Sequence, residues 1–311
     1  MPTRLLTKRR ARQMLIDSMR ACVAANRLPF PVKKAYISRC AQLVADLDTG
    51  SGEPVESDEG LKFVTTLGDS ISISWLMYRG TYEPVLSQFI RDHMKADDVA
   101  VDVGANIGYF SLLMSTCVRP SGKVIAIEAS PSNARRLRAN IELNNADDIV
   151  EIVVAACAPE KGELTLYEHP RVDGWHRLTP PAEGDPDRHY MGDTWIPVVV
   201  PADTLASMVG ADAERVSFIK VDVEGAETAL TPEIATAFPH PDLVVALEVR
   251  ADIETTLKPF KDNGFHIYDL HNDYRWLYER KVPAITRAQY PDFYECESAD
   301  LLLSRRPLAL P

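Results

Sequence analysis

From residue 99 onward, short apolar runs alternate with stretches in which apolar residues recur at helical spacing. Such runs are typical of buried strands, and the helical stretches between them are typical of a parallel sheet covered on both faces. We expect five parallel strands and two strands at an antiparallel edge: Val99–Ala105, Lys123–Ala129, Ile149–Cys157, Arg215–Val223 and Asp242–Val249, then Phe265–Leu270 and Ala299–Ser304. The pattern therefore predicts an α/β fold with a seven-stranded, mostly parallel, doubly wound sheet.

The N-terminal part of the chain has a different pattern. Apolar residues recur at helical spacing up to Asn26 and again over Val32–Leu47, which predicts two helices separated by a proline-containing turn. Residues 49–60 have the glycine-rich, acidic composition of a linker. We therefore divide the chain into an N-terminal helical extension, residues 1–60, and a main domain, residues 61–311.

The segment that joins the linker to the first parallel strand contains two further predicted features. The alternation of apolar and polar residues over Leu61–Met77 predicts two strands, with Gly68-Asp69 as a hairpin turn. Tyr82–Lys95 follows as an amphipathic helix. Within the sheet region, helices are expected at Gly108–Cys117 and Pro131–Leu143.

Charge is distributed unevenly along the 311 residues. The net charge is −11, which makes nucleic acid an unfavourable partner because phosphate backbones attract positive surfaces. Residues 1–40, however, carry ten basic residues against one acidic residue, a net charge of +9 that leaves −20 for the rest. These helices could contact an acidic lipid surface or a partner, and a homo-oligomer could form through them. We favour the simpler alternative that they fold onto the acidic main body.

The sequence also bears on the compartment. It contains no apolar run long enough to span a bilayer, and its basic N-terminus lacks the apolar segment of a signal peptide. The five cysteines are odd in number and form no C-x-x-C pair, which argues against a disulfide framework and against a zinc site. We expect a cytoplasmic protein.

The most informative motif is VDVGANIGYFS, residues 101–111, at a predicted strand end and helix start. Gly104 permits a tight turn, and Gly108 lets the helix begin close against the strand. Backbone N–H groups at such a turn can hold a nucleotide-like ligand. Asn106 stands where a dinucleotide-binding motif has its second glycine, so the turn suits a cofactor without a pyrophosphate, such as S-adenosylmethionine. A nicotinamide-dependent oxidoreductase remains the alternative on this fold.

Two acidic residues complete the predicted cofactor site. Glu128 ends the second strand, 20 residues after Gly108, where a carboxylate can accept both ribose hydroxyls. Asp102 lies beside the turn and could pair, through water, with the ammonium group of the cofactor. The structural alternative is that the two glycines only make a tight turn and that Glu128 caps the next helix.

A second motif, KVDVEGAE, follows the fourth predicted strand. Asp222 and Glu224 share one face of an extended segment, because side chains alternate there. Either carboxylate could take a proton from an acceptor hydroxyl. They could also hold a divalent cation such as Mg²⁺, which we do not favour, so we assign no metal ligand. The alternative is that Glu224 and Glu227 cap the following helix.

Removal of a proton near neutral pH favours histidine as the base. His176 lies in a long irregular segment, from Glu168 to Trp195, of the kind that often covers an active site. We predict that His176 accepts the proton while the carboxylates orient the acceptor, with simple loop exposure as an equal alternative. His271 is a weaker candidate. Glu248, which ends the fifth strand, either lines the same cleft or is an exposed strand end.

Together, DVGANIGYFS, IEASPSNARRLRANIELN, FIKVDVEGAE and GTYEP (residues 80–84) closely resemble the FkbM-type methyltransferases. The resemblance covers about residues 82–303 and implies the Rossmann-like class I methyltransferase fold, S-adenosylmethionine as methyl donor, and a hydroxyl of a small molecule, natural product, sugar or glycan as acceptor. A non-catalytic scaffold that retains this fold is a further alternative. The cofactor-binding residues assigned on motif and resemblance together are Glu83, Asp102, Gly104, Asn106, Gly108, Glu128 and Ala129.

Overall fold

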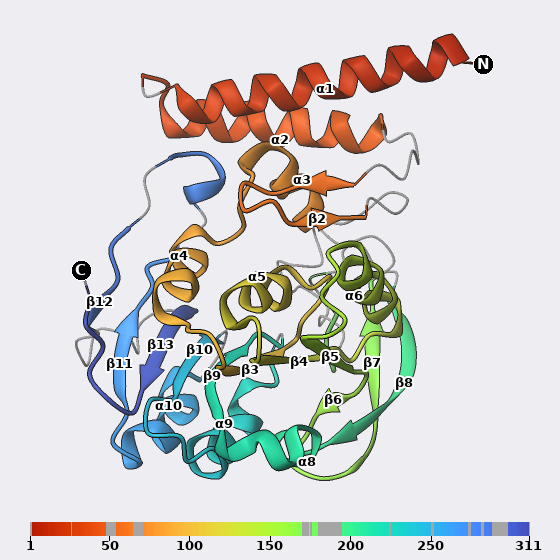
Figure 1. The fold of residues 1–311 in the computed structure, drawn as a ribbon. Coiled ribbons are helices and arrows are strands. Elements are labelled where there is room, and N and C mark those ends of the chain that lie inside the picture. Colours follow the sequence, from red (N-terminus) through yellow and green to blue (C-terminus); the bar gives the residue numbers. More distant parts are fainter. Residues whose placement is uncertain are drawn as a thin grey trace.

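The main sheet of the protein runs through the middle of the molecule (Figure 1). The computed structural model describes residues 2–25, 27–47, 54–64, 71–169, 174, 176–179, 195–223, 225–249, 252–272, 275–280, 283–287 and 298–310. The strand order is β12-β11-β13-β10-β9-β3-β4-β5. The strands are β3 (Val99–Val103), β4 (Lys123–Ile127), β5 (Val150–Val153), β9 (Val216–Val221), β10 (Val244–Val249), β11 (His266–Asp269), β12 (Thr286–Arg287) and β13 (Ala299–Ser304).

The strand directions confirm the predicted fold class. Strands β5, β4, β3, β9 and β10 are parallel neighbours, and β13 runs antiparallel between β10 and β11. Each of the seven predicted strands contributes to this sheet, the third over only part of its length, and within the described residues the short strand β12 adds an eighth at the edge. Chain order reverses between β3 and β9, which is the switch point where ligands bind in open α/β sheets.

Helices cover both faces of this sheet, as Figure 1 shows. Apolar side chains alternate between the faces: Ala100 and Phe218 belong to the hydrophobic cluster on one side, and Val101 and Ile219 to the cluster on the other. The first face is covered by α4 (Pro84–His93), α5 (Tyr109–Val118) and α6 (Pro131–Leu143). The second is covered by α8 (Leu205–Val209), α9 (Glu227–Ala237) and α10 (Ile253–Asp262). Two short 3-10 helices are η2 (Gly210–Glu214) and η3 (Arg275–Leu277).

The third predicted strand, Ile149–Cys157, is divided between two sheets. Residues Val150–Val153 form β5 of the main sheet, whereas β6 (Ala156–Cys157) joins a small sheet of order β6-β8-β7. The other two strands, β7 (Gly162–Glu168) and β8 (Ile196–Asp203), pair antiparallel in the region that the sequence indicated as irregular. The single long strand was therefore wrong, because the chain leaves the main sheet after Val153.

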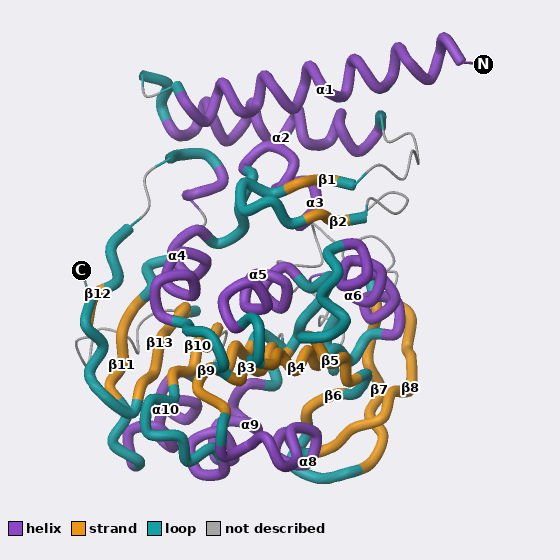
Figure 2. The backbone as a smooth tube through the Cα atoms, in the orientation of Figure 1, coloured by secondary structure: helices purple, strands orange, loops and turns teal. Residues whose placement is uncertain are grey.

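The N-terminal region begins with two helices, α1 (Pro2–Ala24) and α2 (Phe30–Asp46), which lie against one another outside the main layers (Figure 2). The strands β1 (Val55–Glu56) and β2 (Lys62–Phe63) then pair antiparallel. No helix of the described chain is long and apolar enough to cross a membrane. The division of the chain at residue 60 stays a prediction.

The predicted hairpin over Leu61–Met77 is wrong in its second half. Residues 71–79 form helix α3 (Ile71–Arg79), and the predicted turn at Gly68-Asp69 lies outside the described residues. The buried side chains of α3 include Ile73, Leu76 and Met77, a spacing of three and four that fits a helix. The strand-like alternation of serine and isoleucine at the start of this segment concealed that spacing.

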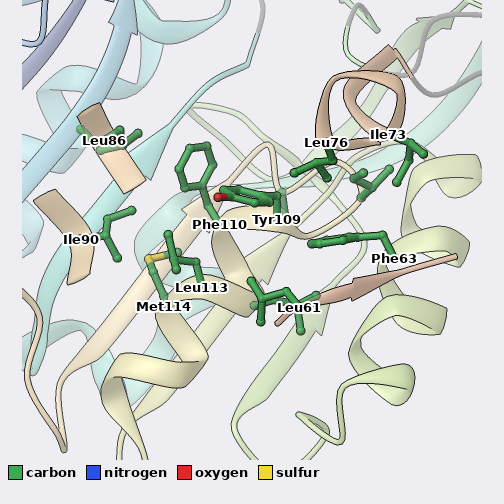
Figure 3. Close-up of a cluster of buried hydrophobic side chains, with 14 of the residues drawn as sticks. Leu61, Phe63, Ile73, Leu76, Leu86, Ile90, Tyr109, Phe110, Leu113 and Met114 are labelled. Carbon is green, nitrogen blue, oxygen red and sulfur yellow. The ribbon is translucent and has the colours of Figure 1, made fainter. Parts of the chain in front are cut away.

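Side chains from this N-terminal region enter the main core. Figure 3 shows Leu61 and Phe63, on either side of Lys62, gathered with Ile73 and Leu76 of α3 near the side chains of α5. The rings of Phe63 and Tyr109 stack with centroids 5.9 Å apart. The same hydrophobic cluster includes buried residues of α1 and α2, so one continuous core joins the N-terminal helices to the α5 face of the sheet.

Candidate active site

The turn after β3 has the backbone conformation that its glycines predicted. Gly104, Asn106 and Gly108 have φ angles of 78°, 51° and 91°. The backbone N–H groups of Gly104 and Ala105 both donate to the carbonyl oxygen of Ile127, at 2.9 and 3.0 Å, which holds the turn against the end of β4. A Cβ on Gly104 would collide with the carbonyl oxygen of Asp222, so glycine is required here by close approach as well as by φ.

Glu128 fixes the other side of the turn. Its Oε2 accepts from the backbone N–H of Asn106 at 2.7 Å, and its Oε1 accepts from the N–H of Ser130 at 2.8 Å. The side chain of Ser130 itself caps α6 by accepting from Asn133 N–H. Burial raises the pKa of Glu128 to about 7, although these two N–H bonds favour the charged form.

A cavity of about 680 Å³, which opens to solvent, lies at this edge of the sheet. Six of the predicted site residues line it: Gly104, Asn106, Glu128, Ala129, His176 and Asp222. Gly108 is not among the lining residues; its Cβ position lies 2.5 Å from Leu137 Cδ1, so this glycine allows α5 to approach α6. Glu224 lies outside the described residues.

Asp102 lies on β3 and is 1% exposed. Its Oδ2 accepts from Ser111 Oγ at 2.6 Å, whereas its Oδ1 is buried without a hydrogen-bond partner among the described residues. Burial raises the pKa of Asp102, and the nearby charge of Lys220 opposes that shift. Asp102, Asn106 and Asp222 line a second cavity, of about 380 Å³, whose wall includes Tyr82.

Lys220 is a site residue that the sequence analysis missed. Its Nζ lies 3.1 Å from Asp222 Oδ2 and 5.0 Å from the centre of the Phe110 ring. The side chain is buried in β9, where its neighbours along the strand are apolar. The signal was present in the sequence, since a lysine within an otherwise apolar strand needs a charged partner.

Lys220 also lines a third cavity, of about 260 Å³. Glu83, Asp222, Glu248 and Asp300 line it together with Lys220. Glu83, assigned to the cofactor on sequence, therefore lines a different cavity from Glu128; it precedes α4 with a φ of 38°. Glu248 lines this third cavity. Of the two interpretations of Glu248, the one in which it lines a cavity fits the structure. Asp222 lines all three cavities and stands where they meet.

His176 lines the 680 Å³ cavity together with residues of the turn. Burial lowers the pKa of His176, and the charge of Glu168 opposes that shift. For Glu168, burial acts to raise the pKa, but hydrogen bonds from Ser130 and Ser132 and the charge of His176 lower it overall. Adjacent to His176, Arg177 exchanges two backbone hydrogen bonds with Tyr167 of β7. His176 is thus held near the end of β7. His271, the weaker histidine candidate, contacts Asp269 and Thr286 instead.

Within the described residues, no three histidine, cysteine, aspartate or glutamate side chains gather as a metal-ion site. Cys22, Cys40, Cys117 and Cys157 are free thiols, and Cys296 lies outside the described residues. The candidate site therefore consists of a backbone turn, buried carboxylates and one buried ammonium group.

Comparison with solved structures gives distant likenesses. The methyltransferase FkbM of Methylobacillus flagellatus is 12% identical, with 75% of this chain and 54% of that chain covered and a TM-score of 0.39. An S-adenosylmethionine-dependent O-methyltransferase of Thermotoga maritima is 15% identical, with 86% and 83% covered and a TM-score of 0.41.

Among curated proteins, methyltransferase sdnD of Sordaria araneosa is 27% identical over 226 residues, which cover 63% of this chain and 85% of the relative. Methyltransferase 1 of Beauveria bassiana is 29% identical over 142 residues, which cover 42% and 56%. The model of the methyltransferase FkbM domain matches residues 102–230, a range that includes KVDVEGAE and all but the first residue of VDVGANIGYFS. Over this range, the chain is similar to the methyltransferase FkbM domain.

Proposed function

We propose that the protein transfers the methyl group of S-adenosylmethionine to a hydroxyl group of a small molecule, natural product, sugar or glycan. One observation carries the proposal: Asp222 lines three adjoining cavities at the switch point of the sheet. The largest of them contains the Gly104 turn and Glu128, which suit a nucleoside. The smallest is lined by Lys220, Glu248 and Asp300, and we assign the acceptor to this side of Asp222.

The residues of the turn fit this cofactor. Glu128 suits the ribose hydroxyls, because its carboxylate still has lone pairs beyond the two N–H bonds that it accepts. Asp102 Oδ1 and Asn106 Oδ1 are buried acceptors without a hydrogen-bond partner in the described part of the chain, and both residues line the second cavity. A donor such as the ammonium group of the cofactor would satisfy them. S-adenosylmethionine supplies an electrophilic methyl group, so the protein must orient the acceptor, exclude water and take one proton.

We assign the proton to Asp222. A carboxylate between the cofactor cavities and the acceptor cavity can accept a hydrogen bond from the reacting hydroxyl and then its proton. His176, the base predicted from sequence, lines the 680 Å³ cavity together with Glu128 and not the 260 Å³ cavity. We therefore place His176 beside the cofactor. Glu224 remains a predicted second carboxylate.

Two experiments separate this function from its alternatives. Calorimetry with S-adenosylmethionine and with NAD should give binding only for the first; the reverse result would favour the nicotinamide oxidoreductase. A screen of hydroxylated acceptors with isotope-labelled cofactor, read by mass spectrometry, should find a product that carries one labelled methyl group on oxygen. Label found on nitrogen or carbon of the true product would overturn the assignment to oxygen, and methyl transfer to any acceptor excludes the non-catalytic scaffold.

Location and assembly stay predictions. We propose a cytoplasmic protein that does not bind nucleic acid, and α1 and α2 as the surface through which an oligomer would form. Exposed apolar side chains on these helices include Met14, Val32 and Tyr36, at 72%, 51% and 43% exposure. Light scattering of the whole chain and of a variant with all three changed to serine should report a lower mass for the variant if the helices join two copies.

A further inference from the structure

Lys220 occupies an unusual place for a charged residue. It lies on β9, between β3 and β10, and pairs in register with Asp102 on one side and Ala246 on the other. Register partners on adjacent strands point to the same face, so Lys220 and Asp102 both face the α5 layer. The lysine side chain is 6% exposed. A charge in this position is costly unless its surroundings compensate it.

The compensation comes from four places in the fold: the end of β9, helix α5, strand β3 and the start of α4. Asp222, just after β9, lies 3.1 Å from the ammonium group, and Phe110 of α5 presents its ring 5.0 Å away. Burial alone would lower the pKa of Lys220, but the negative charges of Asp222, Asp102 and Glu83 raise it. Lys220 is therefore an ammonium group at neutral pH, buried among carboxylates.

This ammonium group stands at the boundary between two cavities. Lys220 and Asp222 line both the 380 Å³ cavity that contains Asp102 and the 260 Å³ cavity that contains Glu248 and Asp300. Asp222 approaches this ammonium group to 3.1 Å. The geometry points to Lys220 as a positioning residue that keeps Asp222 ionised and oriented to accept the proton of the acceptor hydroxyl.

This inference rests on the proposed function, and its chemistry is balanced. The acceptor O–H bond breaks and its proton passes to Asp222. The oxygen electron pair forms the bond to the methyl carbon, and the electrons of the carbon–sulfur bond stay on the leaving thioether. Because an ammonium group at hydrogen-bond distance favours the charged carboxylate, Lys220 keeps Asp222 ready for the next proton.

Loss of the ammonium group should change proton affinity at the site. The charged groups that line the cavities around Lys220 are Glu83 before α4, Asp102 of β3, Asp222 after β9, Glu248 of β10 and Asp300 of β13. All of them are carboxyl groups. Without Lys220 their mutual repulsion would favour protonation of one of them, and Asp222 loses the ammonium group that lies 3.1 Å from it.

The test compares three variants. Lys220→Met removes the charge at similar length, and Lys220→Arg keeps it. Lys123→Met is the matched control, because Lys123 forms ion pairs with Glu151 and Asp212 at the opposite edge of the sheet, on β4, which β3 separates from β9. Lys220→Met should lower kcat about 10²-fold or more at neutral pH and move the acidic limb of the kcat profile to higher pH. Lys220→Arg should keep the limb near its wild-type position, and Lys123→Met should leave both quantities unchanged.

A second readout needs no cofactor. In the apoprotein with ¹³C-labelled aspartate, the carboxyl resonance that disappears in Asp222→Asn should titrate at higher pH in Lys220→Met than in wild type. An unchanged titration of this resonance, or a loss of thermal stability with an unchanged pH profile, would assign Lys220 a purely structural role. If Lys220→Met does not fold, the Lys220→Arg variant decides. An acidic limb of its kcat profile that is shifted from the wild-type position overturns the inference. Failure of the proposed function would appear separately, as absence of S-adenosylmethionine binding by the wild type.

Discussion

Asn106 donates its backbone N–H to Glu128 Oε2 at 2.7 Å, which joins the turn after β3 to the end of β4. Asn106 adopts a left-handed conformation, with φ of 51°, and this orientation directs the N–H at the carboxylate. The turn and the carboxylate proposed to hold the ribose are thus held together before a ligand binds. Preorganisation of this kind lowers the entropy that binding costs.

Replacement of Glu128 by alanine should weaken S-adenosylmethionine binding by about 1–3 kcal/mol, because the ribose hydroxyls and Asn106 N–H lose an acceptor. Isothermal calorimetry measures this directly. Glu163→Ala is the control, since Glu163 is exposed on β7 and does not line the cavity. Equal affinities of the two variants would remove Glu128 from the cofactor site.

Cofactor affinity should depend on pH through the same residue. The pKa of Glu128 is raised to about 7 by burial, and ribose hydroxyls bind the ionised form best. Protonation therefore competes with binding as the pH falls through 7, and affinity should drop roughly tenfold between pH 8 and pH 6. Glu128→Gln should bind weakly with a flat profile. A flat profile in the wild type would contradict the role of the ionised carboxylate.

Gly104→Ala should abolish cofactor binding, because the new Cβ collides with the carbonyl oxygen of Asp222 and the residue keeps a positive φ. The collision acts on Asp222 as well as on the turn, so methyl transfer should be lost with binding. Gly162→Ala provides the comparison, since a Cβ at Gly162 has no atom within 4 Å. Normal binding by a folded Gly104→Ala protein would show that the turn can relax away from β9.

The two candidate proton acceptors predict different kinetics. Asp222→Asn should lower kcat by about 10²–10⁴-fold with cofactor affinity nearly intact. His176→Ala should mainly weaken cofactor binding, because His176 lines the cavity that contains Glu128. The opposite pattern, a loss of kcat in His176→Ala alone, would restore histidine as the base.

Phe63→Ala should destabilise the protein by about 3–5 kcal/mol, because Phe63 is fully buried and stacks on Tyr109 of α5. Denaturant unfolding measures the free energy of unfolding. Val199→Ala, at a position 64% exposed on β8, should change it little. A small effect at Phe63 would mean that the N-terminal segment adds little to the stability of the main domain.

The fold could be predicted where one periodicity dominates. Apolar runs gave the parallel strands, and Pro131–Leu143 was predicted with the bounds that α6 has, because Ser130 and Pro131 mark its start. The segment that became α3 contains strand-like and helix-like spacings together, and tertiary burial of Leu76 and Met77 decides between them. The β7–β8 pair was missed because its strands are separated by residues 169–195 and local patterns do not report such pairing.

The candidate site divides in the same way. Gly104, Asn106 and Glu128 could be predicted because backbone turns and strand ends are properties of local sequence. The separation of Glu83 from Glu128, and the position of His176 near β7, depend on how distant segments pack. The position of Lys220 in the site depends on strand register, since only the pairing of β3 with β9 brings Lys220 beside Asp102.

The small sheet has an evolutionary consequence. The chain leaves the main sheet after β5 and returns to it at β9, while β7 and β8 pair along their whole length and fix both ends of residues 169–195. Each doubling of a loop's length costs only about 0.6 kcal/mol of closure entropy. Insertions in this segment should therefore cost the protein little stability. One wall of the large cavity can thus diversify among descendants of this chain while the strands that carry Asp102, Glu128 and Lys220 are inherited unchanged.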